Sequence, residues 1–160
     1  MTEFRYYAGL SVRKLYLSAI LDLCDRRIVA FALGNTNDTA MVHDTLDQAI
    51  VANPDVHPRF HSDRGFQYTT RIFHDKLASA WMTQNMSRVG KCIDNDPMEG
   101  FWGILKRERY YGRRFTSREA LADMIQTYIA YYNSIRLQRR LGVRTPRSST
   151  PFMPLKYMKS

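Results

Sequence analysis

The stretch from Leu15 to Leu23, LYLSAILDL, constrains the fold more than any other part of the sequence. Leucine and alanine occupy every second position, and the positions between them are also largely apolar, so an extended chain here has two apolar faces. That pattern predicts a central strand of a sheet. After a turn at Asp25-Arg26, the segment from Ile28 to Gly34 is predicted to be its hairpin partner, and the opening TEFRYY has the residue types of a further strand.

Helical spacing and capping residues predict the remaining elements. The predicted helices follow possible N-terminal caps, which are Asn37-Asp38, Thr69 or Thr70, Asp96 (with Pro97 at the first helical position) and a capping box of Thr116 and Glu119. The inner face of the second helix is predicted to carry Ile72, Phe73, Leu77, Ala80 and Trp81, and that of the last helix Leu121, Met124, Ile125, Tyr128, Ile129 and Tyr132. Two more strands are predicted, PRFHSD and WMTQNMS. The result is a mixed α/β chain, short enough for one compact domain.

The charge of the chain favours a polyanionic partner. Lys and Arg number 24 against 15 Asp and Glu, which gives a net charge of +9, and nucleic acid is the simplest partner for such a chain. Cys24 and Cys92 are far apart and suggest neither a disulfide framework nor a zinc ribbon, which is typical of a reducing compartment. The longest apolar run is too short to span a bilayer. A soluble, cytoplasmic protein without a membrane partner is therefore expected.

Two carboxylates stand where a metal site needs them. Asp63 closes a predicted strand and Glu99 lies in the first turn of a predicted helix, with 35 residues between them. Mg²⁺ prefers oxygen ligands, and strand ends and helix starts bring such ligands together. Each residue also has a structural interpretation, since Asp63 can form an Asx turn before Gly65 and Glu99 can complete a capping box with Asp96.

These residues lie in segments that resemble a known family. HSDRGFQY and SRVGKCIDNDPMEGFWGILKRERYY, with the 35-residue gap, resemble the catalytic core of bacterial insertion-sequence transposases of the retroviral-integrase type, the DDE group. KLYLSAILDLCDRRIVAF resembles the second and third strands of that core, and YIAYYNSIRLQRRLGVRTP its closing helix and tail. The resemblance implies a ribonuclease-H-like α/β fold, a mixed five-stranded sheet flanked by helices. It also implies DNA cleavage and strand transfer with two Mg²⁺ ions, for which Mn²⁺ can substitute, and makes Asp63 and Glu99 two of the three acidic ligands.

The family's first acidic ligand has no counterpart in the sequence. By resemblance, an aspartate is expected immediately before Met1, so the chain is predicted to be cut one residue short of its active site. Glu3 lies three strand positions after the expected aspartate, an odd number, so its side chain should point to the opposite face of the sheet. Asp22, on the neighbouring strand, is expected to be structural. Little or no strand transfer is therefore expected from the chain as given. The alternative function is a non-catalytic remnant that binds DNA or full-length transposase.

Several basic residues are candidates for DNA contact. Lys106 lies two helical turns after Glu99 on nearly the same face, whereas Glu108 should point away. Further candidates share a loop or the arginine-rich tail, and are Arg88, Lys91, Arg139 and Arg140. Residues 1–135 are predicted to form the catalytic core and 136–160 a basic tail. The implied partners are element-end and target DNA and a second transposase subunit.

Overall fold

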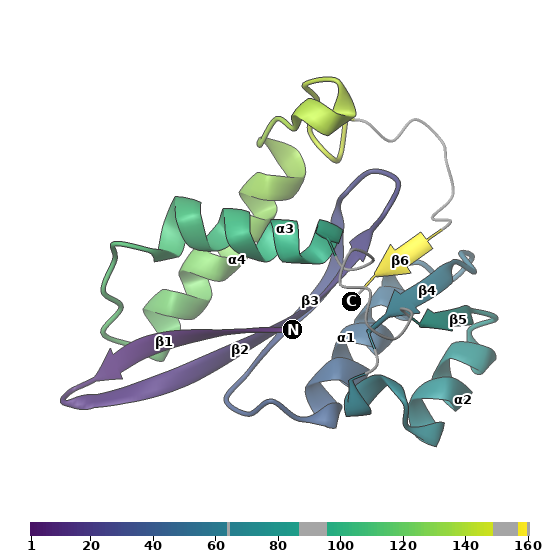
Figure 1. The fold of residues 1–160 in the computed structure, drawn as a ribbon, viewed down its shortest axis with the longest axis horizontal. Helices are drawn as coiled ribbons and strands as arrows, with labels where there is room; N and C mark the ends of the chain where they lie inside the picture. Colours follow the sequence, from purple (N-terminus) through teal and green to yellow (C-terminus); the bar gives the residue numbers. More distant parts are fainter. Residues whose placement is uncertain (64, 87–95, 149–156, 160) are drawn as a thin grey trace.

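The computed structural model describes residues 1–63, 65–86, 96–148 and 157–159, and Figure 1 shows their arrangement. The strands are β1 (Thr2–Ala8), β2 (Ser11–Asp22), β3 (Ile28–Gly34), β4 (Arg59–Ser62), β5 (Thr83–Met86) and β6 (Tyr157–Lys159). The α-helices are α1 (Thr39–Ala52), α2 (Arg71–Ser79), α3 (Asp96–Leu105) and α4 (Arg118–Ser134). Short helical turns cover Phe66–Tyr68, Lys106–Tyr110 and Arg139–Leu141. Every helix in these ranges is too short or too polar to span a lipid bilayer.

The strands form one mixed sheet around β2. β3 pairs with one edge of β2, and β1 pairs with the other edge, where β6 also pairs at residues Leu21 and Asp22. All three pairings with β2 are antiparallel, whereas β4 lies parallel to β6 on one side and to β5 on the other. The order β1-β2-β6-β4-β5 therefore depends on β6 to join the hairpin strands to β4 and β5.

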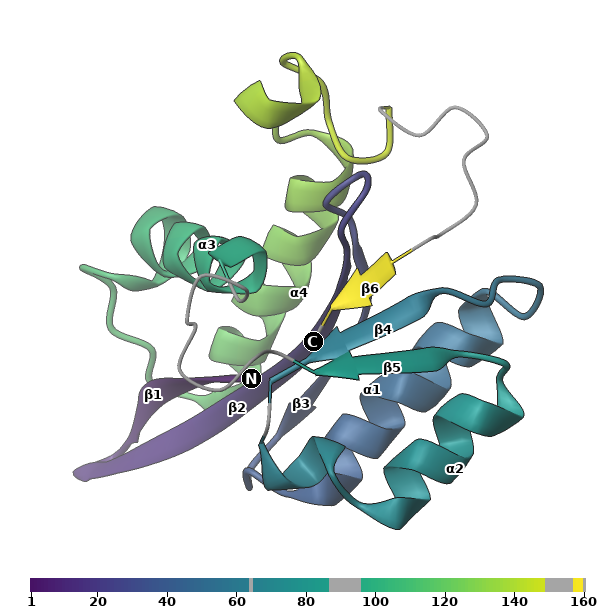
Figure 2. The same ribbon diagram turned by 45° about the vertical axis from the view of Figure 1, so that its right-hand side comes forward.

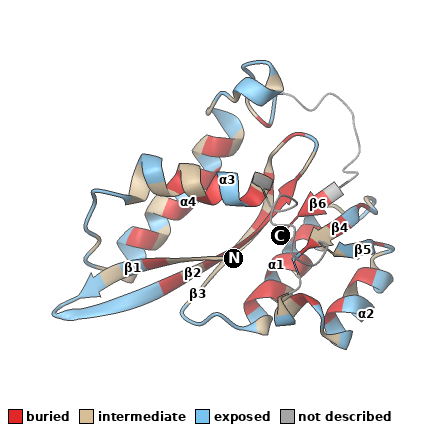
Figure 3. Ribbon diagram, viewed as in Figure 1, coloured by how far each residue is buried: buried red, intermediate tan, exposed pale blue. Residues whose placement is uncertain are grey.

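Helices cover both faces of the sheet, as the two faces of β2 require. On one face α3 and α4 pack against Leu15, Leu17 and Leu21 in a first core cluster. On the other face α1 and α2 pack against Ile20 and β4 in a second core cluster. Figure 3 shows the buried residues concentrated along the sheet and on the inward faces of the helices. Alternation along β2 thus sends successive side chains into two separate cores.

The predicted elements are largely confirmed, with two errors of detail. Phe73 and Leu77 are buried, but Ile72 is 62% and Trp81 79% exposed. Ile72 lies 100° around α2 from Phe73, and Trp81 follows the end of the helix in a left-handed conformation with φ of 57°. The cap of α4 is Ser117 rather than Thr116, because the Ser117 hydroxyl accepts the hydrogen bond from the Ala120 amide.

The face of α4 that was predicted to be core is confirmed. Tyr128 and Tyr132 are buried in the first core cluster. The Tyr128 hydroxyl donates to Glu108 at 2.8 Å, and Arg136 forms an ion pair with the same carboxylate at 2.7 Å. Arg136 and Tyr128 hold the pKa of Glu108 below its usual range. Glu108 therefore ties the helical turn that follows α3 to α4 and to Arg136 just after it.

Asp22 is the buried acid at the end of β2, and its role is structural. It is 2% exposed, and its carboxylate accepts a hydrogen bond from the Cys24 amide at 2.8 Å. Burial raises its pKa from 3.8 to about 6, a shift that the neighbouring charge of Asp25 reinforces. The hydrogen bond shapes the turn between β2 and β3, while the ionised form of the group is unfavourable in the folded chain.

Replacing Asp22 by asparagine is expected to raise the free energy of unfolding at pH 7 by about 1–3 kcal/mol. The folded state holds the Asp22 proton more tightly than the unfolded chain, so stability is lost as the pH rises from about 4 to about 6. Asparagine keeps an oxygen to accept from Cys24 and carries no charge. Urea unfolding at pH 7 and pH 4 measures the effect, which should vanish at the lower pH. An equal gain at both pH values would contradict this account, and Asp44→Asn on the exposed face of α1 is the control.

Candidate functional site

Asp63 follows directly after β4 and is exposed. One of its carboxylate oxygens accepts a hydrogen bond from the Gly65 amide at 2.7 Å, which is the Asx turn considered from the sequence. A methyl group added at Gly65 would lie 2.9 Å from the same oxygen, so glycine is the residue that allows this turn. The turn uses one of two carboxylate oxygens, and it therefore fixes the orientation of Asp63 without excluding a second role.

The amino group of Met1 lies within range of the charge of Asp63. Burial holds the pKa of this amino group below its usual range, and the charge of Asp63 acts in the opposite direction. In the register of β1, Thr2 pairs with Leu17, so the position directly before Met1 faces Ala19 of β2. Ala19 belongs to the first core cluster, on the face that α3 and α4 cover. A side chain at that position would face the same side of the sheet, next to the end of β4.

Glu99 lies in the first turn of α3 and is exposed. Its neighbours Met98 and Phe101 are buried in the first core cluster, which holds this turn against the sheet. Figures 1 and 2 both show α3 beginning toward the middle of the molecule and running outward on the side where β1 lies. The cap role of Asp96 and its pairing with Glu99 lie outside the described residues. That Asp63 and Glu99 share one metal ion remains a prediction.

Glu3 faces away from this region, as predicted. Its carboxylate forms ion pairs with Lys14 at 3.0 Å and Arg5 at 3.4 Å on the exposed side of the β1–β2 hairpin. Phe4, the next residue, is 1% exposed and points into the first core cluster. The alternation along β1 thus places Glu3 on the opposite face from the position before Met1.

The predicted basic residues fall into three groups. Lys106 lies over the Phe4 ring, with its Nζ 5.3 Å from the ring centroid, and burial holds its pKa below the usual range. Arg139 and Arg140 are exposed in the short helical turn after α4. Arg88 and Lys91 lie outside the described residues. Lys106 is therefore held by β1, whereas the two tail arginines present their charge to solvent.

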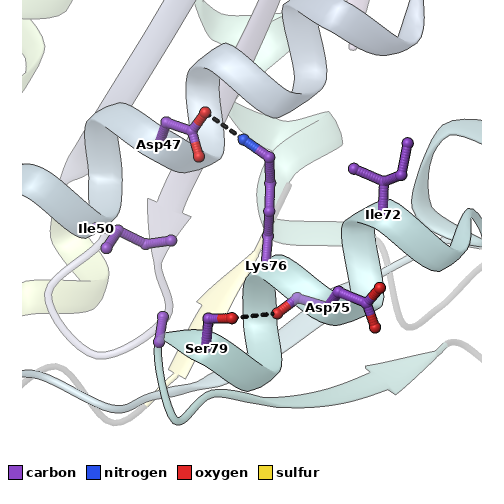
Figure 4. A pocket seen from close by; sticks show the side chains of 7 residues that line it. Asp47, Ile50, Ile72, Asp75, Lys76 and Ser79 are labelled. Atoms are coloured by element: carbon purple, nitrogen blue, oxygen red, sulfur yellow. Dashed lines mark hydrogen bonds and ion pairs between the residues drawn. The ribbon is translucent and has the colours of Figure 1, made fainter.

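A hollow of about 410 Å³ between α1 and α2 lies apart from all of these residues. Figure 4 shows Lys76 reaching across it to pair with Asp47, with Ile50 and Ile72 on its walls. It contains none of the predicted site residues. Within the described ranges, no group of three or more His, Cys, Asp or Glu side chains is arranged to hold a metal ion. Asp63 and Glu99 therefore do not form a complete ligand set among the described residues.

Sequence comparison links the chain to integrases and transposases. The family model described as "Integrase core domain" matches residues 1–92, and a second model with the same description matches residues 99–152. The chain is 40% identical over 147 residues to the putative transposase InsK for insertion sequence element IS150 of Escherichia coli K12, covering 91% of the chain and 50% of that protein. It is 38% identical over 146 residues to an uncharacterized transposase-like protein of Haemophilus influenzae, covering 91% of the chain and 66% of that protein. The chain thus spans between half and two thirds of the length of these relatives.

Solved structures with the same fold are retroviral integrases. The HTLV-2 integrase catalytic core domain in complex with magnesium matches with a TM-score of 0.61 at 13% identity, covering 92% of this chain and 90% of that one. A chain of the simian T-cell lymphotropic virus intasome, solved in complex with PP2A regulatory subunit B56 gamma, matches with a TM-score of 0.69 at 13% identity, covering 96% of this chain and 54% of that one. The ribonuclease-H-like fold is confirmed, and β6 adds a sixth strand to the five that were expected.

Proposed function

Because the chain belongs to the integrase core domain family, with insertion-sequence transposases among its relatives, we propose that it is the catalytic core of a DNA transposase. The proposed reaction is metal-dependent cleavage and joining of DNA phosphodiester bonds. The observation that supports it is the position of Asp63, a carboxylate held by a turn at the end of β4, whose charge acts on the amino group at the start of β1. Glu99, on a helix anchored to the same face, is the proposed second carboxylate.

Asp63 and Glu99 fit a divalent metal ion by the chemistry of their donors. Both are exposed carboxylates, and hard cations such as Mg²⁺ take oxygen ligands. We propose that they hold Mg²⁺, or Mn²⁺ in its place, with a further acidic side chain at the position before Met1. A bound ion would supply Lewis-acid stabilisation of the attacking and leaving oxygens. The Asx turn at Gly65 and the buried side chains on either side of Glu99 preorganise the two carboxylates.

The proposed substrate is the phosphate backbone of element-end and target DNA. The net charge of +9 supports attraction to a polyanion, and Arg139 and Arg140 are exposed for sequence-independent phosphate contact. Lys106 remains a proposed contact, and so do Lys91 and Arg88, which lie outside the described residues. Assembly of more than one copy belongs to the same proposal, because the HTLV-2 core with this fold has been solved in trimeric and dimeric forms.

Metal binding tests the two carboxylates directly. Asp63→Asn and Glu99→Gln are each expected to weaken Mn²⁺ binding by at least about tenfold, because each removes one charged oxygen ligand from the proposed site. The measurement is titration of the full chain with Mn²⁺, followed by electron paramagnetic resonance of the free ion.

Asp55→Asn is the matched control, because it removes an exposed carboxylate of the α1–β4 connection. It should leave the Mn²⁺ affinity unchanged. Equal affinity in the native chain and both site variants would contradict the assignment of Asp63 and Glu99.

A further inference from the structure

The β1–β2 hairpin extends beyond the rest of the sheet. β3 pairs with β2 only from Tyr16 onward, so Ser11–Leu15 of β2 pair with β1 alone. The two strands are joined by the two-residue loop Gly9-Leu10, in which Gly9 has a φ of 62°. Figures 1 and 2 both show this hairpin projecting past the helices, at the opposite end of the molecule from α2. The hairpin end, defined as Arg5–Lys14, is therefore a two-stranded ribbon.

One face of the hairpin end carries exposed basic and aromatic side chains. Phe4 points into the first core cluster, so the alternation along β1 puts Arg5 and Tyr7 on the other face of the sheet. Their cross-strand partners on β2 are Lys14 and Val12, and all four of these side chains are exposed. The helices α1 and α2 pack against a more central part of β2. This face is therefore open to a partner.

The connection between α3 and α4 borders the free edge of β1. The Arg5 amide donates a hydrogen bond to the Tyr110 hydroxyl at 2.8 Å. The Tyr7 amide donates to the Phe115 carbonyl oxygen, also at 2.8 Å. The guanidinium of Arg114 lies over the Tyr7 ring, with its Cζ 4.4 Å from the ring centroid. The arginines of this connection therefore share a surface with the hairpin end.

Basic residues far outnumber acidic ones on this surface. Residues 1–21 contain three basic residues and one acid, Glu3, and residues 109–118 contain four arginines and no acid. Glu3 forms its ion pairs with Arg5 and Lys14. An excess of like charge disfavours the compact state through repulsion, and it attracts a ligand of opposite charge. The charge therefore points to a polyanion as the partner of this surface.

Arg13 and Arg114 have donors to offer such a partner. Both side chains are exposed, and among the described residues neither guanidinium forms a hydrogen bond or an ion pair. Contact with the Tyr7 ring leaves the donors of Arg114 able to bind phosphate. Arg13 is opposite Tyr6 in the hairpin, on the face that does not carry Arg5. Cations therefore flank the hairpin end on both of its faces.

The hairpin end lies apart from the proposed metal site. β1 has seven residues, and a strand rises about 3.3 Å per residue, so Leu10 is roughly 25 Å from Met1 along the hairpin. The charge of Asp63 acts on the amino group of Met1, at the other end of the same strand. A ligand that contacts both places must therefore be long as well as anionic.

We propose that the hairpin end, together with Arg113 and Arg114, is a DNA-binding surface that holds duplex DNA by its phosphate backbone at a distance from the proposed metal site. The inference rests on the proposed function, because that proposal identifies the polyanion as DNA. A two-stranded ribbon fits the major groove, and cations on its two faces reach the phosphates on either side. Contacts of this kind position the duplex without reading its sequence.

The salt dependence of DNA binding tests this surface. We expect the double variant Arg13→Gln, Arg114→Gln to reduce the slope of log affinity against log salt by about 1.8, because two phosphate contacts are lost. Its affinity at about 0.1 M salt should fall by at least about tenfold. The measurement is fluorescence anisotropy of a labelled duplex of about 30 base pairs, without divalent metal ions so that no cleavage occurs.

The double variant Arg59→Gln, Arg71→Gln is the matched control. It removes the same charge from exposed positions on β4 and α2, and its slope should equal that of the native chain. Equal losses in the two double variants would overturn the proposal, since net charge alone would then explain binding. A changed oligomeric state with unchanged DNA affinity in the hairpin variant would also overturn it, and would identify a protein partner instead.

A variant that gains affinity separates binding from folding defects. Leu10 is fully exposed at the tip, so Leu10→Lys is expected to increase the salt slope by about 0.9 and to raise the affinity at least about threefold. Val51→Lys adds the same charge on the exposed surface of α1 and should change neither quantity. Absence of a gain for Leu10→Lys would overturn the proposal. Mn²⁺ binding tests Asp63 and Glu99 without DNA, so failure of this proposal and failure of the proposed metal site are distinguishable.

Discussion

An aspartate added directly before Met1 is expected to raise metal-dependent nicking of DNA by the chain by at least about 100-fold, the size of loss seen when one group that stabilises developing charge is removed. The added residue would face Ala19, on the side of the sheet that α3 covers. The charge of Asp63 already acts on the amino group of Met1, the group to which the added residue would be joined. A third carboxylate there completes the proposed acidic ligand set. There is room for a single added residue, because it would pair with Ala19. Lys159 of β6 pairs with Leu21, which lies two positions further along β2.

The measurement is the rate of nicking of supercoiled plasmid DNA in Mn²⁺, with the added residue left after proteolytic removal of a tag. The control chain carries asparagine at the same position, which matches the length and removes only the charge. Asp63→Asn in the aspartate-extended chain should return the rate to that of the control. Equal nicking by the aspartate and asparagine chains would contradict the proposed site.

Replacing Phe101 by alanine is expected to lower the free energy of unfolding by about 3–5 kcal/mol. Phe101 is 1% exposed, and its ring meets Tyr132 edge-on at 4.8 Å and lies 5.0 Å from the ring of Trp102. The truncation leaves a cavity between α3 and α4 that the neighbouring rings cannot fill. Such a loss is a large fraction of the roughly 5–15 kcal/mol that stabilises a typical domain.

Urea unfolding monitored by circular dichroism measures the loss. Phe66→Ala is the control, because Phe66 is 76% exposed and its removal should change the free energy of unfolding by less than about 0.5 kcal/mol. If Phe101→Ala does not fold, Phe101→Leu should fold with an intermediate loss. A loss below about 1 kcal/mol for the alanine variant would contradict the packing described for α3.

The elements with strong local patterns were predictable from the sequence. β2 and β3 follow from the alternation of apolar residues and a turn, and the cap of α1 at Asp38 was among the two candidates. The prediction that Ile72 faces the core was wrong. Ile72 and Phe73 are adjacent on the helix, and only Phe73 is buried. Propensity and spacing thus determine where elements form more reliably than which side chains they bury.

β6 was not predictable in this way. Tyr157, Met158 and Lys159 carry no alternation of their own within a basic tail, and they form a strand because β2 and β4 offer paired edges. In the candidate site, the elements that carry Asp63 and Glu99 were predicted correctly. The effect of the Asp63 charge on the Met1 amino group depends on the packing of two strands that are distant in the sequence, so no local pattern reveals it.

The end-to-end placement of β6 and β1 makes the chain suited to circular permutation. A short linker from the C-terminus to Met1 would join the two segments into a continuous strand along β2. New ends can be opened in the β1–β2 turn, where Gly9 has a φ of 62° and Leu10 is fully exposed. The permuted protein would keep every described strand pairing. The linker would also tie β6 covalently to β1, which would then follow it directly in the sequence.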